Sequence, residues 1–458
     1  MQLMTKPKDF QEDGVRMIEG FADKALLADD MGLGKTFQAL YWLARNTRPR
    51  WPALVVCPAS VKYNWRNEAY DHFRIASTVI EGHAPDRIGG IFNPSTPPIT
   101  IINYDLLQSW APALRAMKFK SVIYDEVHAF QNSESIRTTV ATDFSHTIPG
   151  RLGLSGTPLT NRPADLWPIL NILNPSIYPS WDVYAQRYTF PRLTRYGWTF
   201  EGGRNLDELN ATLLRTIMIR RRKSILKLPG KFRHIRMVEM LDPGEYYEAS
   251  NNFLHWLGKQ FAGKARSRVT KAKKAEKLVK VGYLLRLAAK QKLYGTIQQI
   301  NGWLDANPTE KAIVFANHTP MLDALGRRLN ARSVIVDGSV AAKTRDEYKH
   351  KFQTDPNTRL FIGNLRACGT GLNLTAAANV IMTELPWTPA ALTQGEDRAY
   401  RLGQTRPVQV HYMIAKGTIE ERICDTLQTK QDHVQSVLDG DYDNIDLDLR
   451  DLLLKGLV

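Results

Sequence analysis

The chain has 458 residues, of which 43% are hydrophobic and 23% charged, values that are ordinary for a globular protein. That length allows two or three domains with substantial cores. No apolar run approaches the ~20 residues that span a membrane. The start of the chain is too polar for a secretory signal, and the three cysteines lie too far apart for a disulfide framework. We therefore expect an intracellular protein of the bacterial or viral nucleoid or cytoplasm, or of the nucleus if it is eukaryotic.

The charge is strongly positive, with 61 Lys and Arg against 46 Asp and Glu, a net charge of +15 and a pI near 9.6. Such an excess favours a polyanionic partner such as nucleic acid. Residues 261–292 hold eleven of the basic residues and one acidic residue, Glu276. This run is either a solvated helix face or a phosphate-binding segment. If it binds phosphates, Lys271, Lys273 and Lys274 are the candidate contacts.

The first half of the chain alternates short apolar strands with helical patterns up to about residue 172. The expected strands are 25–28, 54–56, 99–102, 122–124 and 152–154. Strands that alternate with helices predict a parallel sheet covered on both faces. The alternation is lost between residues 175 and 203, and a helical stretch is expected at 213–218.

The alternation resumes in the second half, where the expected strands are 312–315, 334–336, 360–362, 380–382 and 408–414. A helix from about Thr418 closes this second α/β unit. The tail is first acidic and then leucine-rich. We therefore expect an α/β protein divided into 1–222, a basic helical linker at 223–300, a second unit at 301–438 and a tail at 439–458.

A glycine-rich turn joins the first expected strand to a helix that begins at Lys35. Its glycines allow backbone N–H groups to point at phosphate oxygens, Lys35 can reach the terminal phosphates, and the Thr36 hydroxyl suits Mg²⁺. The usual signature has Gly where Asp29 stands, so a simple helix-start turn is the alternative. The candidate nucleotide-binding residues of this phosphate loop are Asp29, Met31, Gly32, Leu33, Gly34, Lys35 and Thr36.

Two carboxylates follow the apolar run 122–124, about ninety residues after the phosphate loop. A buried strand that ends in two acids is what a magnesium–nucleotide site needs. Asp125 would hold the ion, and Glu126 would orient and deprotonate the attacking water. Together with the phosphate loop, this pair of acids predicts nucleotide hydrolysis. It also argues against the alternative that the glycine-rich turn is a simple helix start with a surface lysine.

Residues 29–36 and the block from Asp125 to His128 together resemble the Swi/Snf family of superfamily-two, helicase-like ATPases. In that family an aspartate is usual at the position of Asp29. The resemblance extends from about residue 8 to 425 and implies two RecA-like lobes, ATP and Mg²⁺ as cofactors, and DNA-stimulated hydrolysis. In the first lobe it implies Gln11 for adenine, Ser60, Asn64, Trp65, Tyr104 and Arg220 for DNA contacts, and Ser155, Gly156 and Thr157 for coupling hydrolysis to movement.

The second lobe carries further blocks of the same resemblance, including residues 369–374 and 394–404. Arg398 and Arg401 are three apart, so on a helix they would share one face and could neutralise charge that develops on the γ-phosphate. A pair of surface salt bridges is the alternative for these arginines. The resemblance also implies Gly371 and Gln394 for the nucleotide and Trp387 for DNA.

Three positions depart from the family pattern without removing a catalytic group: Val127, Cys368 and Glu384. The expected function is an ATP-driven translocase on double-stranded DNA, nearest the annealing-helicase subfamily that rewinds or remodels forked DNA. A strand-separating DNA or RNA helicase is one alternative, and a nucleotide-gated DNA-binding scaffold with little turnover is another. We expect a monomer that does not bind membranes. Its direction of movement and its protein partners do not follow from the sequence.

Overall fold

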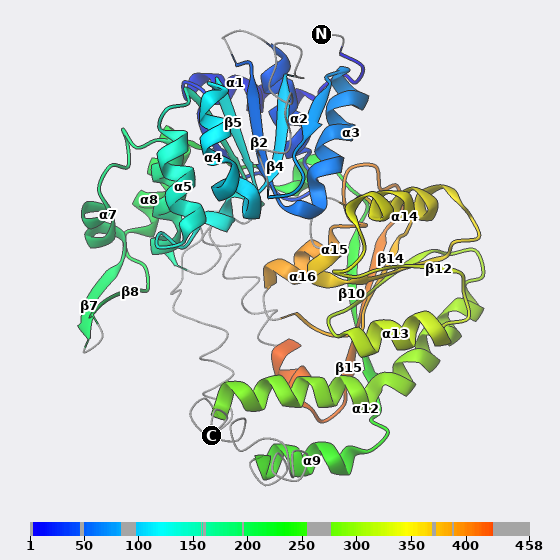
Figure 1. Ribbon diagram of the computed structural model, residues 1–458. Helices are drawn as coiled ribbons and strands as arrows, with labels where there is room; N and C mark the ends of the chain where they lie inside the picture. The colour runs from blue at the N-terminus through cyan, green and yellow to red at the C-terminus, as the bar shows by residue number, and fades with distance from the viewer. Residues whose placement is uncertain are drawn as a thin grey trace. The chain divides into compact units, whose positions relative to one another are not determined.

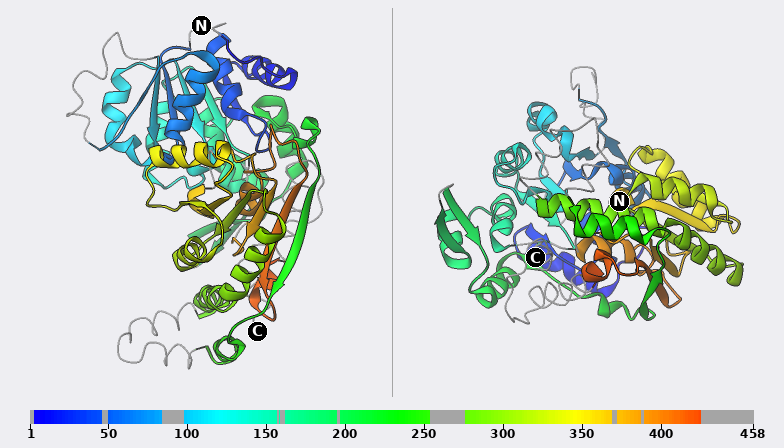
Figure 2. Two further views of the ribbon diagram at one scale, coloured as in Figure 1. Left: turned by 90° about the vertical axis from the view of Figure 1, so that its right-hand side faces the viewer. Right: turned by 90° about the horizontal axis from the view of Figure 1, so that it is seen from below.

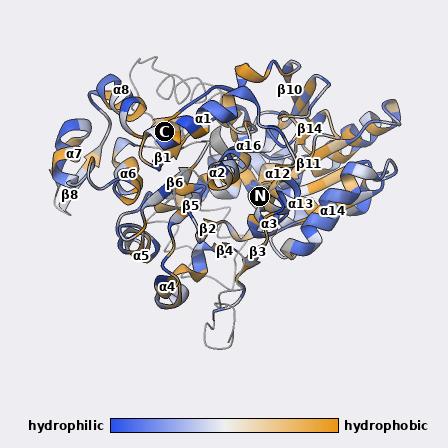
Figure 3. Ribbon diagram, turned by 90° about the horizontal axis from the view of Figure 1, so that it is seen from above, coloured by the Kyte–Doolittle hydropathy of each residue, from blue (hydrophilic) through white to orange (hydrophobic). Residues whose placement is uncertain are grey.

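The structure is a computed structural model that describes residues 3–45, 50–83, 98–156, 158, 162–194, 197–253, 276–368, 372–386 and 389–424. These residues divide into two compact units, the first ending at Lys227 and the second beginning at Leu228 (Figure 1). Each unit has its own sheet with hydrophobic strands, whereas the outer side of a helix such as α14 (Ala342–Thr354) is hydrophilic (Figure 3). Among the described helices, none is both long and apolar enough to cross a membrane.

The first unit contains a seven-stranded sheet of order β3-β4-β2-β5-β6-β1-β9, in which every neighbouring pair is parallel. Its strands are β1 (Lys24–Leu27), β2 (Ala53–Cys57), β3 (Ser77–Val79), β4 (Ile99–Asn103), β5 (Ser121–Asp125), β6 (Gly150–Leu154) and β9 (Met218–Ile219). The five strands expected here are confirmed. Strands β2, β4 and β6 are buried along their whole length, as expected for a parallel sheet with both faces covered.

Helices cover both faces of this sheet. Residues of α1 (Asp9–Gly20), α2 (Lys35–Arg45) and α3 (Lys62–Phe73) belong to one hydrophobic cluster. The opposite cluster takes residues from α4 (Leu107–Ala116), α5 (Ile136–Ser145), α6 (Trp167–Leu173), α7 (Trp181–Tyr188) and α8 (Leu206–Thr216). The expected start of a helix at Lys35 is confirmed.

Two parts of the first unit differ from the expectation. The helix expected at 213–218 ends at Thr216, because Met218 pairs with Leu26 as the edge strand β9. The region 175–203, where the sequence pattern is lost, contains α7 and an antiparallel hairpin of β7 (Phe190–Thr194) and β8 (Gly197–Glu201). In both parts, the pairing of strands overrides the apolar spacing.

The second unit contains a six-stranded parallel sheet of order β10-β15-β14-β11-β13-β12. Its strands are β10 (Lys231–Val238), β11 (Ala312–Ala316), β12 (Ser333–Val336), β13 (Leu360–Asn364), β14 (Asn379–Met382) and β15 (Val408–Ala415). The five expected strands are confirmed, and β10 is an additional edge strand within the expected linker. Its helices include α9 (Pro243–Asn251), α12 (Glu276–Ala306), α13 (Thr319–Arg328), α14, α15 (Leu365–Cys368) and α16 (Pro389–Glu396).

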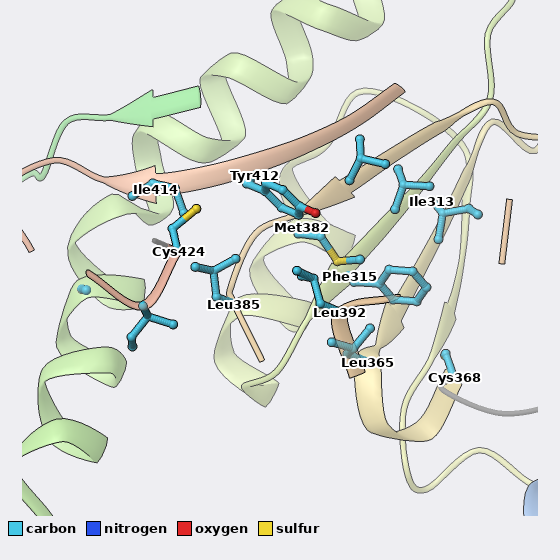
Figure 4. Close-up of a cluster of buried hydrophobic side chains, with 14 of the residues drawn as sticks. Ile313, Phe315, Leu365, Cys368, Met382, Leu385, Leu392, Tyr412, Ile414 and Cys424 are labelled. Carbon is cyan, nitrogen blue, oxygen red and sulfur yellow. The ribbon is translucent and has the colours of Figure 1, made fainter. Parts of the chain in front are cut away.

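The core of the second unit gathers between its strands and helices, with Ile313, Phe315, Met382 and Tyr412 facing one cluster (Figure 4). Helix α12, drawn in green, contacts β10 and β15 (Figure 2). Its residues Ile300 and Leu304 also belong to a hydrophobic cluster with residues of β11, β13 and β14. Residues 419–424 are helical, as expected from Thr418 onward. The expected tail at 439–458 lies outside the described residues.

Candidate active site

The phosphate loop lies at the carboxyl end of β1, where ligands bind in parallel α/β sheets. Gly32 and Gly34 have φ values of +88° and +74°, which only glycine adopts without strain. A Cβ on Gly34 would also lie 2.6 Å from Gln11 Nε2. Lys35 Nζ donates to the carbonyl oxygens of Asp29 at 2.7 Å and Asp30 at 3.3 Å. The loop therefore has the backbone curvature and the lysine that the sequence predicts.

The electrostatic surroundings of Lys35 combine burial with carboxylates. Burial lowers the pKa of Lys35, and the charges of Glu126, Asp29, Asp125 and Asp30 act in the opposite direction. The pKa of Lys35 thus depends on Asp125 and Glu126, at and directly after the end of β5, as well as on the acids of its own loop. The two blocks that the sequence analysis joined are close in space.

Asp29, which stands where many phosphate loops have glycine, is 0% exposed. Its carboxylate accepts from Arg221 Nε at 2.9 Å and Nη2 at 2.5 Å, and from Gln38 Nε2 at 3.0 Å. Arg221 also donates to the carbonyl of Phe10. The structural role of Asp29 is therefore to anchor Arg221, a residue to which the sequence analysis gave no role in the site. Direct contact of Asp29 with a nucleotide stays a prediction.

Arg220 lies beneath the same loop. It donates to the carbonyl oxygen of Ala28 at 2.7 Å and forms an ion pair with Asp30 at 2.9 Å, and its side chain is 8% exposed. A weaker bond at 3.4 Å reaches the carbonyl of Gly156. The family resemblance implies that Arg220 contacts DNA. The structure places this guanidinium among groups of the nucleotide site, and its DNA contact stays a prediction.

The Gln11 side chain is buried beside the phosphate loop. Its amide donates to the carbonyl of Leu33 at 3.3 Å and accepts from the backbone N–H of Lys8 at 3.0 Å. The amide therefore links α1 to the loop. Its expected contact with adenine stays a prediction.

Asp125 ends β5, and Glu126 follows it with φ +54° and ψ +53°, a left-handed conformation that is costly for a side chain of this kind. Strain of this type concentrates at functional sites. Burial, and then the charge of Glu126, raise the pKa of Asp125 to about 7, against the hydrogen bond from Trp65 and the charge of Lys35. The charge of Glu126 therefore opposes the ionisation of Asp125.

His128 connects this pair to the expected coupling block. Its Nδ1 lies 3.3 Å from Glu126 Oε2 and 3.3 Å from Ser155 Oγ. Burial lowers the pKa of His128, but Glu126 and Asp125 outweigh it and raise the pKa above its ordinary value. A Cβ on Gly156 would lie 2.7 Å from Met31 Cγ, so that block also touches the phosphate loop. Thr157 lies outside the described residues.

Trp65 and Tyr104, two expected DNA contacts, both bind Asp125. Trp65 Nε1 donates to Asp125 Oδ2 at 2.8 Å, and the Tyr104 hydroxyl donates to the Asp125 carbonyl at 2.5 Å. The two residues are 1% and 7% exposed. By contrast, two other expected DNA contacts are partly exposed. Ser60 lies in the short helix η1 (Ala59–Val61), and Asn64 lies in the first turn of α3, which follows it.

In the second unit, Arg398 and Arg401 follow α16, which ends at Glu396. The expectation that they share a helix face is wrong, because the helix has ended and residues 397–401 form turns and bends. In this segment the backbone N–H of Arg398 donates to the carbonyl of Gly395, and the N–H of Tyr400 donates to the carbonyl of Glu396. Their side chains nevertheless converge, and each Nη1 donates to the carbonyl of Leu372, at 3.1 and 2.9 Å.

The remaining predicted positions are less informative. Gln394 lies on α16 and is partly buried. Glu384, one of the departures, accepts from the backbone N–H groups of Asn317 at 2.6 Å and His318 at 3.0 Å and pairs with the His318 ring. Besides Thr157, the predicted residues that lie outside the described ones are Gly371, Trp387, Lys271, Lys273 and Lys274.

The donor set of the first unit fits a magnesium ion. Mg²⁺ is usually held by one or two protein oxygens together with phosphate oxygens and waters. Asp125 supplies a carboxylate at the end of β5, and Thr36 supplies a hydroxyl in the first turn of α2. Both remain predicted ligands.

The first unit has a glycine-rich loop between a strand and a helix, and paired acids at the end of another strand of the same parallel sheet. The chain also contains a second α/β unit. These features define a phosphate-loop nucleotide-binding protein of the helicase-like class. Residues 10–292 match the SNF2-related domain and residues 293–403 match the helicase conserved C-terminal domain. The chain belongs to the SNF2-related family of helicase-like ATPases, so the resemblance inferred from the sequence is confirmed.

Among curated relatives, the chain is 33% identical over 430 residues to the Xenopus tropicalis "SWI/SNF-related matrix-associated actin-dependent regulator of chromatin subfamily A-like protein 1", a match that covers 92% of this chain and 44% of that protein. It is 32% identical over 461 residues to the Mus musculus "DNA annealing helicase and endonuclease ZRANB3", covering 96% and 41%. The chain thus spans less than half the length of these relatives. The Sulfolobus solfataricus SWI2/SNF2 ATPase core in complex with dsDNA matches with a TM-score of 0.43 and 24% identity, covering 96% and 94%.

Proposed function

We propose that this chain hydrolyses ATP to ADP and phosphate in a DNA-stimulated cycle and uses the cycle to move along double-stranded DNA. One observation carries the hydrolytic part: Lys35 of the phosphate loop lies close enough to Asp125, the last residue of β5, and to Glu126, which follows it, for the charges of both to act on its pKa. Three groups thus lie at the carboxyl ends of the strands of this sheet: Lys35 for the terminal phosphates, Asp125 for a metal ion and Glu126 for the attacking water. Membership of the SNF2-related family supports the same function.

Each side chain has a role in this proposal. Lys35 binds the terminal phosphates, and the loop N–H groups hold the remaining oxygens. Thr36 and Asp125 hold Mg²⁺, which when bound neutralises charge on the phosphates. Glu126 orients the attacking water and accepts its proton, and His128 keeps the Glu126 carboxylate in place. We assign Arg398 and Arg401 of the second unit to the charge that develops on the γ-phosphate, as the family resemblance implies.

Double-stranded DNA is the proposed substrate, with forked or branched DNA as the finer proposal. The net charge of +15 favours a polyanion, and one relative is named a DNA annealing helicase. The name of that relative favours rewinding of DNA over strand separation. We further propose that the protein acts inside the cell and as a monomer.

The test is the rate of ATP hydrolysis with duplex DNA, forked DNA, single-stranded DNA and RNA side by side. The proposal expects duplex and forked DNA to stimulate the rate most, and expects Lys35→Ala to abolish turnover while DNA binding persists. Stimulation by single strands alone would favour a strand-separating helicase. If hydrolysis with duplex DNA equals that of Glu126→Gln, the protein is a nucleotide-gated scaffold and the proposal fails.

A further inference from the structure

Two aromatic side chains grip the last residue of β5 from two different segments. Trp65 lies on α3, which follows β2, and Tyr104 lies directly after β4. The sheet order β4-β2-β5 means that the Tyr104 hydroxyl reaches across β2 to arrive at the Asp125 carbonyl. Neighbouring strands are about 4.8 Å apart, so this is a reach of two strand spacings.

The two hydrogen bonds constrain different parts of Asp125. The Trp65 indole N–H donates to one oxygen of the Asp125 carboxylate, which also receives a hydrogen bond from the backbone of Glu126. The Tyr104 hydroxyl holds the main chain at the point where it turns into the left-handed Glu126. Side-chain and backbone positions of the predicted metal ligand therefore depend on two residues that are almost completely buried.

Trp65 is joined to a segment that is partly open to solvent. Trp65 follows Asn64 on α3, one turn after Ser60 in η1, and these two residues are partly exposed. Lys62, in the first turn of α3, is anchored by a bond of 2.9 Å from Nζ to the carbonyl of Ile80. Because Trp65 lies on α3, a ligand that shifts the start of this helix also shifts Trp65 and the Asp125 oxygen to which Trp65 donates (α3 and β5 in Figure 1).

We propose that Trp65 is a positioning residue that transmits DNA binding at Ser60 and Asn64 to the metal-binding carboxylate of Asp125, and that Tyr104 is a positioning residue that fixes the backbone of the same aspartate. This proposal rests on the proposed function. DNA bound at the start of α3 holds Trp65 in the position in which its N–H fixes Asp125, and this order at the metal site is what raises the rate of hydrolysis. The aromatic rings themselves do not touch DNA.

The test uses Trp65→Phe, which keeps an aromatic ring and removes the N–H. The measured quantity is the binding of a fluorescent ATP analogue as a function of the Mg²⁺ concentration, so this readout does not depend on hydrolysis. A hydrogen bond to a charged group is worth roughly tenfold or more in an equilibrium. We therefore expect the Mg²⁺ concentration for half-maximal binding to rise about tenfold in Trp65→Phe. Stimulation of hydrolysis by duplex DNA should fall similarly, with the affinity for DNA unchanged.

The matched control is Trp42→Phe. Trp42 is also buried, and its Nε1 also donates to a carboxylate, Asp23 Oδ1, at 2.8 Å. Asp23 precedes β1 and so lies at the opposite end of the strand from the phosphate loop. The control variant should lose a comparable hydrogen bond and keep the Mg²⁺ dependence and the DNA stimulation of the unchanged protein. Tyr104→Phe should shift both quantities in the same direction as Trp65→Phe.

Three results overturn the proposal. If Trp65→Phe weakens DNA binding and leaves the Mg²⁺ dependence unchanged, Trp65 is a DNA contact. If it changes neither, the indole fills space and nothing more. If Trp42→Phe has the same effect as Trp65→Phe, the change reflects general loss of stability. Failure of the proposed function is seen separately, because the unchanged protein would then hydrolyse ATP with duplex DNA no faster than Glu126→Gln.

Discussion

Arg221 binds the Asp29 carboxylate with two nitrogen atoms, across 192 positions of the chain. The pair joins the phosphate loop to the segment that follows β9, shortly before the first unit ends at Lys227. A glycine at position 29 would leave the guanidinium of Arg221 without this carboxylate. The aspartate therefore ties the end of the first unit to its nucleotide loop.

Arg221→Ala should lower the free energy of unfolding of the first unit by about 3 kcal/mol, because it leaves a buried carboxylate without its main partner. Asp29 is 0% exposed and the Arg221 side chain is 17% exposed. The measurement is denaturant unfolding, with ATP affinity recorded in parallel. Arg16→Ala is the control, since Arg16 pairs with Glu12 and Asp13 at 60% exposure. Equal effects of the two variants would show that the Asp29 pair has no special weight.

The local features of the site could be predicted from the sequence. The apolar runs predicted ten strands that the structure contains, and the spacing of Gly32, Gly34 and Lys35 predicted the loop because these residues are neighbours in the chain. The strand β10 escaped because its charged and apolar residues are mostly exposed, as on an edge strand, so no apolar run marks it.

The partners of Asp125 could not be predicted in the same way. Their proximity depends on the order β4-β2-β5, which the strand pattern does not specify. Moreover, Trp and Tyr in a block that resembles a DNA contact are also the residue types that stack on bases. The contacts of Trp65 and Tyr104 with the same aspartate therefore depend on the tertiary structure and do not follow from the sequence pattern.

Arg401→Ala should leave nucleotide binding nearly intact and reduce the rate of hydrolysis roughly a thousandfold, as expected for an arginine that stabilises transition-state charge. Arg401 is partly buried, whereas Arg398 is 6% exposed and donates to the carbonyls of both Leu372 and Gln394. Arg398→Ala should therefore also destabilise the second unit. Single-turnover hydrolysis and thermal unfolding of both variants separate the two effects. An unchanged rate in Arg401→Ala would remove its assigned role.

Glu396 should make the second unit sensitive to acid. Burial opposes its ionisation, but the hydrogen bond from Arg233 and the charge of Lys231 outweigh burial and lower its pKa from 4.5 to about 2. Lys231 Nζ lies 2.6 Å from Oε2, and Arg233 donates to both carboxylate oxygens at 2.8 Å. A depressed pKa in the folded state contributes stability above the unfolded value near 4.5 and loses it as the pH falls toward 2.

The contribution of Glu396 is about 3 kcal/mol at neutral pH, by the linkage between pKa and stability. Unfolding measured across that acid range should give a shallower pH dependence for Glu396→Gln than for the unchanged protein. The difference between the two curves isolates Glu396 from other groups that titrate, such as His411, whose pKa burial lowers to about 4. Parallel curves would show that Arg233 and Lys231 do not stabilise the ionised carboxylate.

The basic run 261–292 is tested by the salt dependence of DNA affinity. Each phosphate contact by a Lys or Arg contributes about 0.9 to the slope of log affinity against log salt for duplex DNA. Replacing Lys271, Lys273 and Lys274 together by Gln should therefore reduce the slope by up to about 2.7, if all three bind phosphates. The control replaces three lysines of α14, Lys343, Lys349 and Lys351, which changes the net charge equally. If both triple variants keep the original slope, the run is a solvated surface and the DNA contacts lie elsewhere.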